Sequence, residues 1–393
     1  MKPGYKQTEV GVIPEEWEVK PLNNRISIAH GFPFASHYFA GSGYYRLTTP
    51  GHFYEGGGFR DLGAKQKYYD GPVPADYVLA PGDLIVAMTE QADGLLGSAA
   101  VIPPIPGYLH NQRLGRVKPL TSEVDLSYLF WVFNSASYRS KVRETAAGTK
   151  VKHTSPEKLL EILVGLPPLP EQRAIATALS DVDALLGALD RLITKKRNLK
   201  QAAMQQLLTG KTRLPGFHGE WVVMRLGDMA ELYQPETIGQ SVFTPEGFPV
   251  YGANGVIGRY GRFNHSTRQI TISCRGNCGT VNRTEQHSWI TGNAMVINLD
   301  NNSSVDSDFI FELLRAQDFS VLVTGSGQPQ IVRGPLNNFR LRLPTEKAEQ
   351  AAIAEVLSGM DAELAALERR QEKTRALKQG MMQELLTGRT RLV

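Results

Sequence analysis

The chain has 393 residues, of which 41% are hydrophobic and 21% charged. These fractions are typical of a soluble globular protein, and the length suits two or three domains. No stretch of about 18 uncharged apolar residues occurs and no signal-peptide pattern is present, so we expect a cytoplasmic protein. Two cysteines cannot cross-link a chain of this size, which fits a reducing compartment. The net charge of +4 permits a nucleic-acid partner without requiring one.

The most informative feature of the sequence is an internal repeat. Residues 171–214 and 349–392 align without a gap, and about 27 of about 44 positions are identical. A repeat at this spacing indicates duplication of a domain-sized unit and excludes a solenoid. The dipeptide Glu16-Trp17 also recurs as Glu220-Trp221, just after the first copy. Each duplicated unit is therefore a variable block followed by a near-identical segment.

Both near-identical segments are predicted to be long helices. Their apolar residues fall at alternating steps of four and three, which is the pattern of a coiled-coil seam. The seam contains Ile175, Leu179, Leu186 and Leu189 in the first copy and Ile353, Leu357, Leu364 and Leu367 in the second. Prolines precede both segments, and Gly210 and Gly388 follow them. Between these limits each helix has about 36 residues and a length of roughly 55 Å.

The charges along each helix predict how the two helices pair. Asp181, Asp183 and Asp190 lie in the first half of one helix, and Lys195, Lys196, Arg197 and Lys200 in its second half. The second helix repeats this gradient, so opposite charges face each other if the helices are antiparallel. Such a pair would carry the variable blocks at opposite ends, related by an approximate twofold axis. A simpler origin of the gradient is that acidic and basic residues complement each helix dipole, and both can hold.

The variable blocks are predicted to be mixed α and β. In the first we expect strands at 83–88 and 113–120 and then a helix at 125–142. The second has the same order, with strands at 269–274 and 294–299 and a helix at 306–319. The predicted fold class is therefore α+β, with an internal pseudo-twofold repeat. Its expected divisions are residues 1–167 (first block), 168–214 (helix), 215–344 (second block) and 345–393 (helix).

The sequence contains no catalytic constellation. Cys274 and Cys278, near His265 and His287, could be considered as a metal site, but their spacing matches no familiar zinc site, and two unlinked thiols are the better interpretation. No phosphate-binding GxxxxGK[ST] loop and no adenine-methylase motif of the Asn/Asp-Pro-Pro-aromatic type occurs. We therefore expect no metal and no cofactor in this chain.

Binding side chains do occur in both blocks. Between Leu214 and Glu346 every Lys or Arg is an arginine, the side chain suited to guanine edges and phosphates, although genome base composition could give the same bias. The candidate DNA contacts in the second block are Tyr251, Asn254, Arg259, Tyr260, Arg275, Asn277 and Arg283. Those in the first block are Arg46, Thr48, Thr49, Thr89, Gln91, Asn111, Gln112 and Arg113. A further set precedes each helix: Lys150, Lys152, His153, Gln328, Gln330 and Arg333. Solvated loops are the simpler interpretation for any one of these residues.

These features together resemble one known family. Two variable blocks alternate with two near-identical helices, bordered by LPPLPEQRAIA and LLTGKTRLPGF in the first copy and by EQAAIA and LLTGRTRL in the second. The blocks also contain GFPFAS at 31–36 and YGANGVIG at 251–258. Over essentially its whole length the chain is similar to the specificity subunit of type I restriction-modification systems. The second helix departs from the pattern at its entry, where LPTEKAEQ replaces LPPLPEQ.

The resemblance implies a DNA-recognition subunit without chemistry of its own. Each block would be a target-recognition domain for one half of a split, asymmetric double-stranded DNA site, and the helices would set the spacing between the halves. Two modification subunits carrying S-adenosylmethionine would dock on the helices and methylate adenine. Restriction subunits would supply translocation and cleavage with ATP and Mg. Recognition domains at two ends of a rigid helix pair would read half-sites about one DNA turn, roughly 34 Å, apart.

Two other functions remain open at this point. One is a specificity subunit of a type IIG-like restriction-methylation enzyme, which the neighbouring genes would distinguish. The other is a coiled-coil adaptor that binds no DNA. The adaptor hypothesis predicts no salt-sensitive affinity for duplex DNA, whereas phosphate contacts make binding fall steeply with salt.

Overall fold

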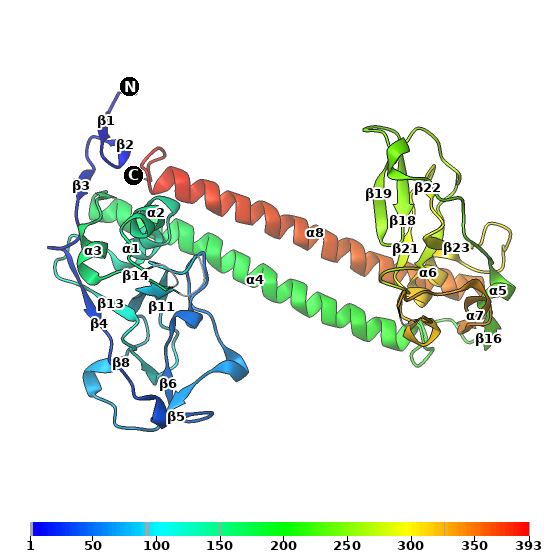
Figure 1. Cartoon of the computed structure of the whole chain (residues 1–393), viewed down its shortest axis with the longest axis horizontal. Coiled ribbons are helices and arrows are strands. Elements are labelled where there is room, and N and C mark those ends of the chain that lie inside the picture. Colours follow the sequence, from blue (N-terminus) through cyan, green and yellow to red (C-terminus); the bar gives the residue numbers. More distant parts are fainter. Residues whose placement is uncertain (1–2, 91–93, 149–150, 326, 393) are drawn as a thin grey trace. The chain divides into compact units, whose positions relative to one another are not determined.

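The computed structural model describes residues 3–90, 94–148, 151–325 and 327–392. It divides into two compact units (Figure 1). Unit 1 consists of Met1–Ala188 and Gln371–Val393, and unit 2 of Leu189–Arg370. Each unit therefore contains one variable block together with a part of both long helices.

The two repeated segments are helices of 39 residues, as the heptad pattern predicts. They are α4 (Leu169–Leu207) and α8 (Lys347–Leu385). Both helices end where the glycines predict. Gly210 and Gly388 have φ angles of 67° and 68°, in the left-handed region that favours glycine at a helix end. A Cβ on Gly388 would lie 2.4 Å from the Pro14 ring, so this position also excludes a side chain.

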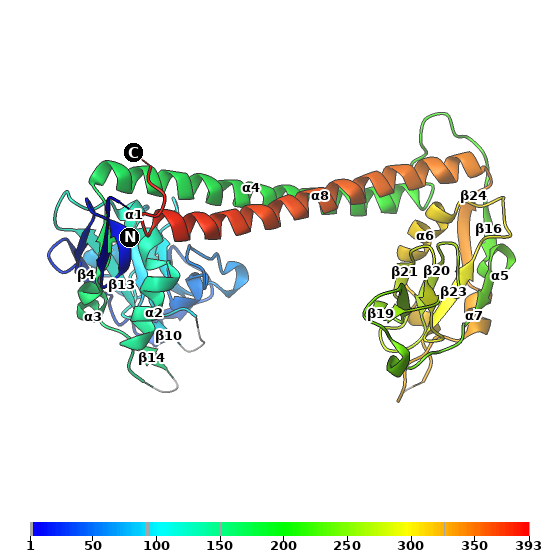
Figure 2. The same cartoon turned by 90° about the horizontal axis from the view of Figure 1, so that it is seen from above.

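Contacts within each unit show that α4 and α8 run antiparallel (Figure 2). In unit 1, Asp183 of α4 pairs with Lys378 of α8, and Glu171 at the start of α4 binds Arg391 beyond the end of α8. In unit 2, Lys200 pairs with Asp361. Residue numbers rise along one helix as they fall along the other, which confirms the orientation that the charge gradient predicts.

Unit 1 is built around a four-stranded antiparallel sheet in the order β11-β9-β13-β4. Its strands are β4 (Ile26–His30), β9 (Leu84–Ala87), β11 (Ala99–Val101) and β13 (Leu114–Pro119). The helices of this unit before α4 are α1 (Leu126–Phe133), α2 (Ala136–Glu144) and α3 (Pro156–Glu161). The predicted strands at 83–88 and 113–120 are confirmed as β9 and β13.

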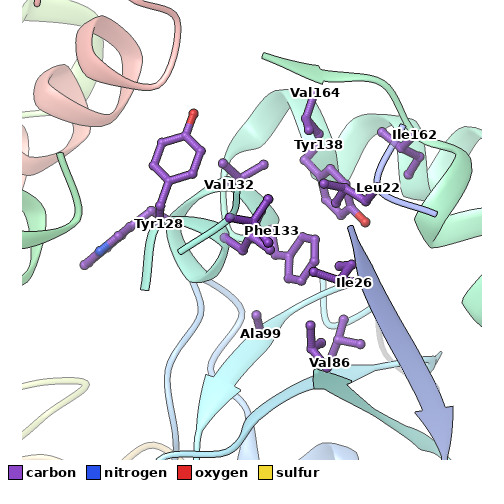
Figure 3. Packing of buried hydrophobic residues seen from close by; sticks show 14 of the residues in the cluster. Leu22, Ile26, Val86, Ala99, Tyr128, Val132, Phe133, Tyr138, Ile162 and Val164 are labelled. Atoms are coloured by element: carbon purple, nitrogen blue, oxygen red, sulfur yellow. The ribbon is translucent and has the colours of Figure 1, made fainter. Parts of the chain in front are cut away.

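The core of unit 1 joins this sheet to the helices (Figure 3). Phe133 of α1 points toward Ile26 and Val86 of the sheet, and its ring centroid lies 4.9 Å from that of Tyr138 in α2. Ile175 and Leu179 of α4 belong to the same buried cluster. Fully burying one such apolar side chain stabilises the fold by roughly 2–3 kcal/mol. Packing therefore fixes the recognition block to the beginning of α4.

The predicted helix at 125–142 is interrupted, and the reason lies in two polar side chains. The amide of Asn134 exchanges hydrogen bonds with the backbone of Ala99 in β11, accepting from its N–H and donating to its carbonyl. The Ser135 hydroxyl then caps α2 by accepting from Tyr138 N. Helix periodicity continues through this point, so sequence spacing alone could not locate the break.

A second sheet and several short elements complete unit 1. The five-stranded sheet has the order β5-β7-β6-β12-β8, with only β12 and β6 parallel. Its strands are β5 (Phe39–Ala40), β6 (Tyr45–Leu47), β7 (Tyr68–Tyr69), β8 (Val78–Leu79) and β12 (Tyr108–Leu109). The remaining pairs are β1 (Tyr5–Thr8) with β2 (Gly11–Pro14), β3 (Glu18–Lys20) with β15 (Val164–Leu166), and β10 (Thr89–Glu90) with β14 (Lys152–His153).

Unit 2 repeats the mixed α/β plan with different dimensions. Its four-stranded antiparallel sheet, in the order β17-β23-β20-β21, consists of β17 (Glu231–Tyr233), β20 (Ile270–Ser273), β21 (Val281–Arg283) and β23 (Ala294–Asn298). A three-stranded sheet contains β18 (Phe248–Gly252), β19 (Gly255–Tyr260) and β22 (Trp289–Ile290), and β16 (Trp221–Arg225) pairs with β24 (Arg340–Pro344). The short helices are α5 (Leu226–Met229), α6 (Ser307–Arg315) and α7 (Arg333–Asn337). The predicted strands at 269–274 and 294–299 and the helix at 306–319 are confirmed as β20, β23 and α6.

Candidate DNA-binding surfaces

Each recognition block is attached to the helix pair by a buried carboxylate at the start of a long helix. Glu349 of α8 is fully buried, and Arg213 donates to both of its carboxylate oxygens at 2.5 and 2.6 Å. Glu171 of α4 is equally buried and receives Arg391 in the same way, at 2.6 and 2.9 Å. The tail that follows each helix thus binds the beginning of the other helix.

The glutamine beside each of these carboxylates holds the recognition block itself. Gln172 Oε1 accepts a hydrogen bond from Asp125 N at 2.9 Å, and Asp125 caps α1. Gln350 Oε1 accepts from Asp306 N at 2.7 Å, and Asp306 caps α6. A buried amide must find partners, so each Glu-Gln pair is matched to its tail arginine and to its helix cap. The repeated Glu-Gln dipeptide is therefore a pair of structural connectors.

The predicted contacts of the first block gather around β10 and β14. Thr89 Oγ1 lies 3.2 Å from Nδ1 of the exposed His153. Beside them Lys152 Nζ is 3.8 Å from the buried Glu90 carboxylate. Thr89 also lines a pocket together with Thr49 and the exposed Arg113. The pocket contains two lysines that the sequence analysis missed, Lys65 and Lys67. Their sequence neighbourhood carries no motif, so only the fold brings them to these residues.

Several predicted contacts of the first block support the fold instead. Thr48 is fully buried, and Asn111 is 8% exposed with its Oδ1 accepting from Arg113 N. Arg46 donates to Pro106 O at 3.0 Å and lies over the Tyr68 and Tyr108 rings. Thr48 and Asn111 are therefore too buried in this conformation to contact DNA directly. Gln112 is exposed, and Gln91 and Lys150 lie outside the described residues.

In the second block, an antiparallel bridge brings two predicted contacts together. Arg275 and Gln330 are paired across this bridge, although 55 positions separate them in the sequence. The Ile331 N–H donates to Cys274 O at 3.1 Å, which fixes the same two segments. Asn277, Gln328 and Arg333 are exposed in the neighbouring stretches of chain. Arg275 and Gln330 thus lie opposite each other in the bridge and are both exposed, and arginine and glutamine are residue types that can read base edges.

The β18–β19 hairpin carries the other exposed candidates of this block. Asn254 lies at its turn, where Asn282 of β21 donates to Ala253 O at 3.4 Å. Arg259 on β19 is exposed and donates to Gly247 O at 2.8 Å. Tyr260 is half-buried and packs edge-on against Trp289, with ring centroids 5.3 Å apart. The hairpin can present Asn254 and Arg259 to a ligand.

Two candidates of the second block are structural. Tyr251 is 5% exposed, its hydroxyl accepts from Glu285 N, and burial raises the pKa of the phenol. Arg283 pairs with Asp308 and lies 4.6 Å from the centroid of the Phe311 ring. Both residues join β-strands to neighbouring segments, so their side chains are already engaged inside the domain.

The apolar residues predicted as the partner-binding set are buried within this chain. Ile175, Leu179, Leu186, Leu189, Ile353, Leu357 and Leu364 are less than 9% exposed, and Leu367 is half-buried. They form the seam and the attachment to the recognition blocks, so their assignment as partner contacts is corrected. In unit 2 the exposed apolar residues of α4 are Leu192 and Leu199, at 39% and 46%. Seven residues separate them, which places both on one face of the helix.

The described part of the chain shows no group of three or more His, Cys, Asp or Glu side chains that could hold a metal ion. Cys274 is buried and Cys278 half-buried, and both are free thiols. Burial raises the pKa of the Cys274 thiol to about 11. In the same residues no helix is long and apolar enough to cross a membrane.

Two mixed domains, each tied to a shared helix pair by the same contacts and each with its own exposed polar surface, define a two-site binding protein. A model of the type I restriction modification DNA specificity domain matches residues 14–198 and 218–376. The chain belongs to this family and carries two copies of the domain. Its function is DNA sequence recognition in a type I restriction-modification system.

Similar proteins extend over the whole chain. The putative type I restriction enzyme MjaX specificity subunit of Methanocaldococcus jannaschii is 25% identical over 425 residues, covering 99% of this chain and 97% of that protein. The EcoBI specificity subunit of Escherichia coli is 31% identical over 209 residues, which cover 51% of this chain and 40% of that protein. The solved structure of a type I system S subunit from M. genitalium superposes with a TM-score of 0.67 at 16% identity, covering 98% of this chain and 99% of that one. This structural similarity establishes the shared fold.

Proposed function

We propose that each recognition domain binds one half of a split, asymmetric DNA site, and that partner subunits methylate adenine and restrict DNA under its direction. One observation supports this proposal: both units repeat the same contacts at the start of a long helix, but the exposed residues of the two recognition domains differ. Arg213–Glu349 and Arg391–Glu171 bind the tails to the helices alike in both units. Arg275 and Gln330 are paired at the positions that Thr89 and His153 occupy in the other domain, where Ile331 N donating to Cys274 O matches Thr154 N donating to Met88 O, so equivalent positions carry different side chains. Two different surfaces on one repeated frame favour two different half-sites.

The test is single-molecule methylome sequencing of a methylation-free host that expresses this chain with its neighbouring modification gene. A split asymmetric motif methylated on adenine is the expected result. No new methylation from a complex in which the modification subunit co-purifies would favour the adaptor hypothesis. A split motif made with a single fused restriction-methylation partner would identify the type IIG-like arrangement.

We further propose that this chain is non-catalytic and that the chemistry belongs to its partners. Two modification subunits would hold S-adenosylmethionine, and restriction subunits would use ATP and Mg. A solved structure similar in fold, with a TM-score of 0.53 at 18% identity, is described in terms of complex assembly of the type I R-M system. Assembly with such subunits is the natural role for exposed apolar residues on a helix that is otherwise well packed.

We propose Leu192 and Leu199 as part of the surface that binds a modification subunit. Leu199 lines a shallow groove of about 540 Å³ on the second half of α4 together with Arg191, Lys195 and Asn198, and Leu192 is exposed one heptad before it on the same helix. The corresponding positions of α8 are Arg370 and Leu377, so the second helix lacks this leucine pair. A partner helix with an apolar face would bury both leucines.

Replacing both Leu192 and Leu199 with glutamate is expected to weaken co-purification of the modification subunit at least tenfold, because two charges would be buried at the interface. The thermal stability of the isolated chain should stay nearly unchanged, since both residues are exposed. Gln201→Glu/Gln205→Glu, at two exposed positions of the same helix, is the charge-matched control. Full binding by the double variant would place the modification subunit elsewhere.

Replacing Arg275 with alanine is expected to weaken binding of the cognate duplex by about 1–3 kcal/mol and to relax one position of a single half-site. Competition binding against duplexes with single base changes, and methylome sequencing of the variant complex, would measure both effects. Arg268, which is exposed in another loop of the same domain, provides the matched arginine control. An unchanged motif together with unchanged affinity would remove Arg275 from the reading surface.

A further inference from the structure

The pocket in the first recognition domain is unusually positive. Its volume is about 370 Å³, and its charged lining residues are Lys65, Lys67 and Arg113. Thr49, Thr89 and His52 are the other polar residues of its lining. No carboxylate belongs to the described lining. All three cations are exposed, and none of them is within 4.0 Å of a carboxylate among the described residues.

A buried polar network holds this pocket in shape. Thr49 N donates to His52 Nδ1 at 3.1 Å, so Nδ1 is the acceptor and Nε2 carries the proton. Nε2 in turn donates to Gln66 Oε1 at 2.8 Å. The Gln66 amide donates to the backbone carbonyls of Leu47 and Lys67. His52 and Gln66 thus connect both sides of the pocket, and the backbone that carries Lys67 is fixed before any ligand arrives.

The nearby ionisable groups form no ion pair with the three cations. Burial lowers the pKa of His52, so this imidazole is neutral at pH 7. Glu90, behind Thr89, has its carboxylate bound by the N–H groups of Leu95 and Leu96, with Lys152 on its other oxygen. Asp61 uses a carboxylate oxygen to accept from Gly63 N. An anion in the pocket would therefore meet three cations that have no competing partner in the lining.

We propose that this pocket binds one phosphodiester group of the DNA backbone, with Lys65 and Lys67 as its anchors and Arg113 as the third cation. This inference rests on the proposed function, since it assigns a role within the same DNA-binding domain. Lysine is a compact point charge with three rotatable donors, which suits phosphate oxygens rather than one base edge. The Thr49 and Thr89 hydroxyls can donate to the remaining oxygens. The pocket then positions the first half-site and leaves its sequence to be read by other residues.

The test compares the Lys65→Ala/Lys67→Ala variant with the wild-type chain, each assembled with the modification subunit. Affinity is measured at several salt concentrations on the cognate duplex and on a duplex of unrelated sequence. The variant should bind both duplexes roughly tenfold more weakly. The slope of log affinity against log salt should fall by about 1, because the pocket holds one phosphate and each lost phosphate contact reduces the slope by about 1. The methylated motif should not change.

Two variants control for general effects of charge and folding. Lys65→Arg/Lys67→Arg keeps both charges and should retain most of the affinity. Lys118→Ala removes an exposed lysine of β13 that does not line the pocket and should leave the salt slope near the wild-type value. Both lysines of the pocket are exposed, so thermal unfolding of the alanine variant should match that of the wild type.

Three outcomes would overturn the assignment. An unchanged salt slope would show that the lysines contact no phosphate of the duplex. A change in the methylated motif would show that they read a base. Inorganic phosphate or a nucleoside monophosphate that binds the wild-type complex, fails to bind the alanine variant and does not compete with duplex would identify a site for a free phosphate ligand. No duplex binding by the wild-type complex would instead contradict the proposed function itself.

Discussion

Replacing Arg213 with alanine is expected to lower the unfolding temperature of unit 2 by roughly 10 °C. The substitution removes the partner of Glu349, whose side chain is fully buried, and leaves a carboxylate without its two guanidinium hydrogen bonds. Removing one member of a buried pair is strongly destabilising because the remaining charge stays desolvated. Differential scanning calorimetry of the purified chain would measure the shift. Tryptophan fluorescence would report on the same region, since the Arg213 guanidinium lies 5.9 Å from the centroid of the Trp221 ring.

The duplicated pair provides a matched comparison. Arg391→Ala removes the same interaction from Glu171, but Trp17 Nε1 still donates to that carboxylate at 3.0 Å. Trp221 Nε1 has no hydrogen-bond partner among the described residues, so no tryptophan donates to Glu349 as Trp17 does to Glu171. We therefore expect Arg391→Ala to be the milder variant. Arg213→Ala/Glu349→Gln should recover a large part of the lost stability, and a double variant as unstable as the single one would contradict this explanation.

Removing one heptad from each long helix is expected to change the spacer of the DNA site while both half-sites stay the same. A suitable variant lacks residues 182–188 of α4 and 373–379 of α8, which are opposite each other within unit 1 around the Asp183–Lys378 pair, and it keeps Leu192 and Leu199. Seven residues are about two turns and roughly 10 Å of helix, and the deletion rotates the remaining helix by only about 20°. At about 3.4 Å per base pair the spacer should shorten by up to about 3 base pairs. Methylome sequencing of the assembled variant would give both half-sites and the spacer.

Deleting the heptad from α4 alone is the control for this experiment. It would misalign Lys200 with Asp361, so we expect it to reduce stability and methylation together. The two-helix deletion preserves these pairings and should keep the complex intact. Altered half-sites in the two-helix variant would contradict the proposal that the helices set spacing and the recognition domains read sequence.

The repeat and its periodicity were sufficient to predict the duplicated helices and the family resemblance, and the charge gradient favoured an antiparallel pair. Periodicity is a local property of the chain, and it located α4 and α8 because apolar residues at steps of three and four must share one face. The acidic and basic halves predicted the orientation, and the Asp183–Lys378 pair confirms it. The resemblance to the family of specificity subunits depended on these repeated segments, so it could be stated without the tertiary structure.

Which polar residues form a surface could not be predicted without the fold. Thr48 and Thr49 are neighbours in the sequence, yet Thr48 is fully buried and Thr49 lines the pocket of the first domain. Alternation along an extended segment sends successive side chains to opposite sides, and the sequence of a loop does not say which side is covered. Lys65 and Lys67 joined Arg113 through long-range packing, in a region without a motif. The leucines of the helices follow the same reasoning. The regularly spaced seam residues are buried within the chain, whereas Leu192 and Leu199 remain exposed, and the periodicity of the sequence does not distinguish the two sets.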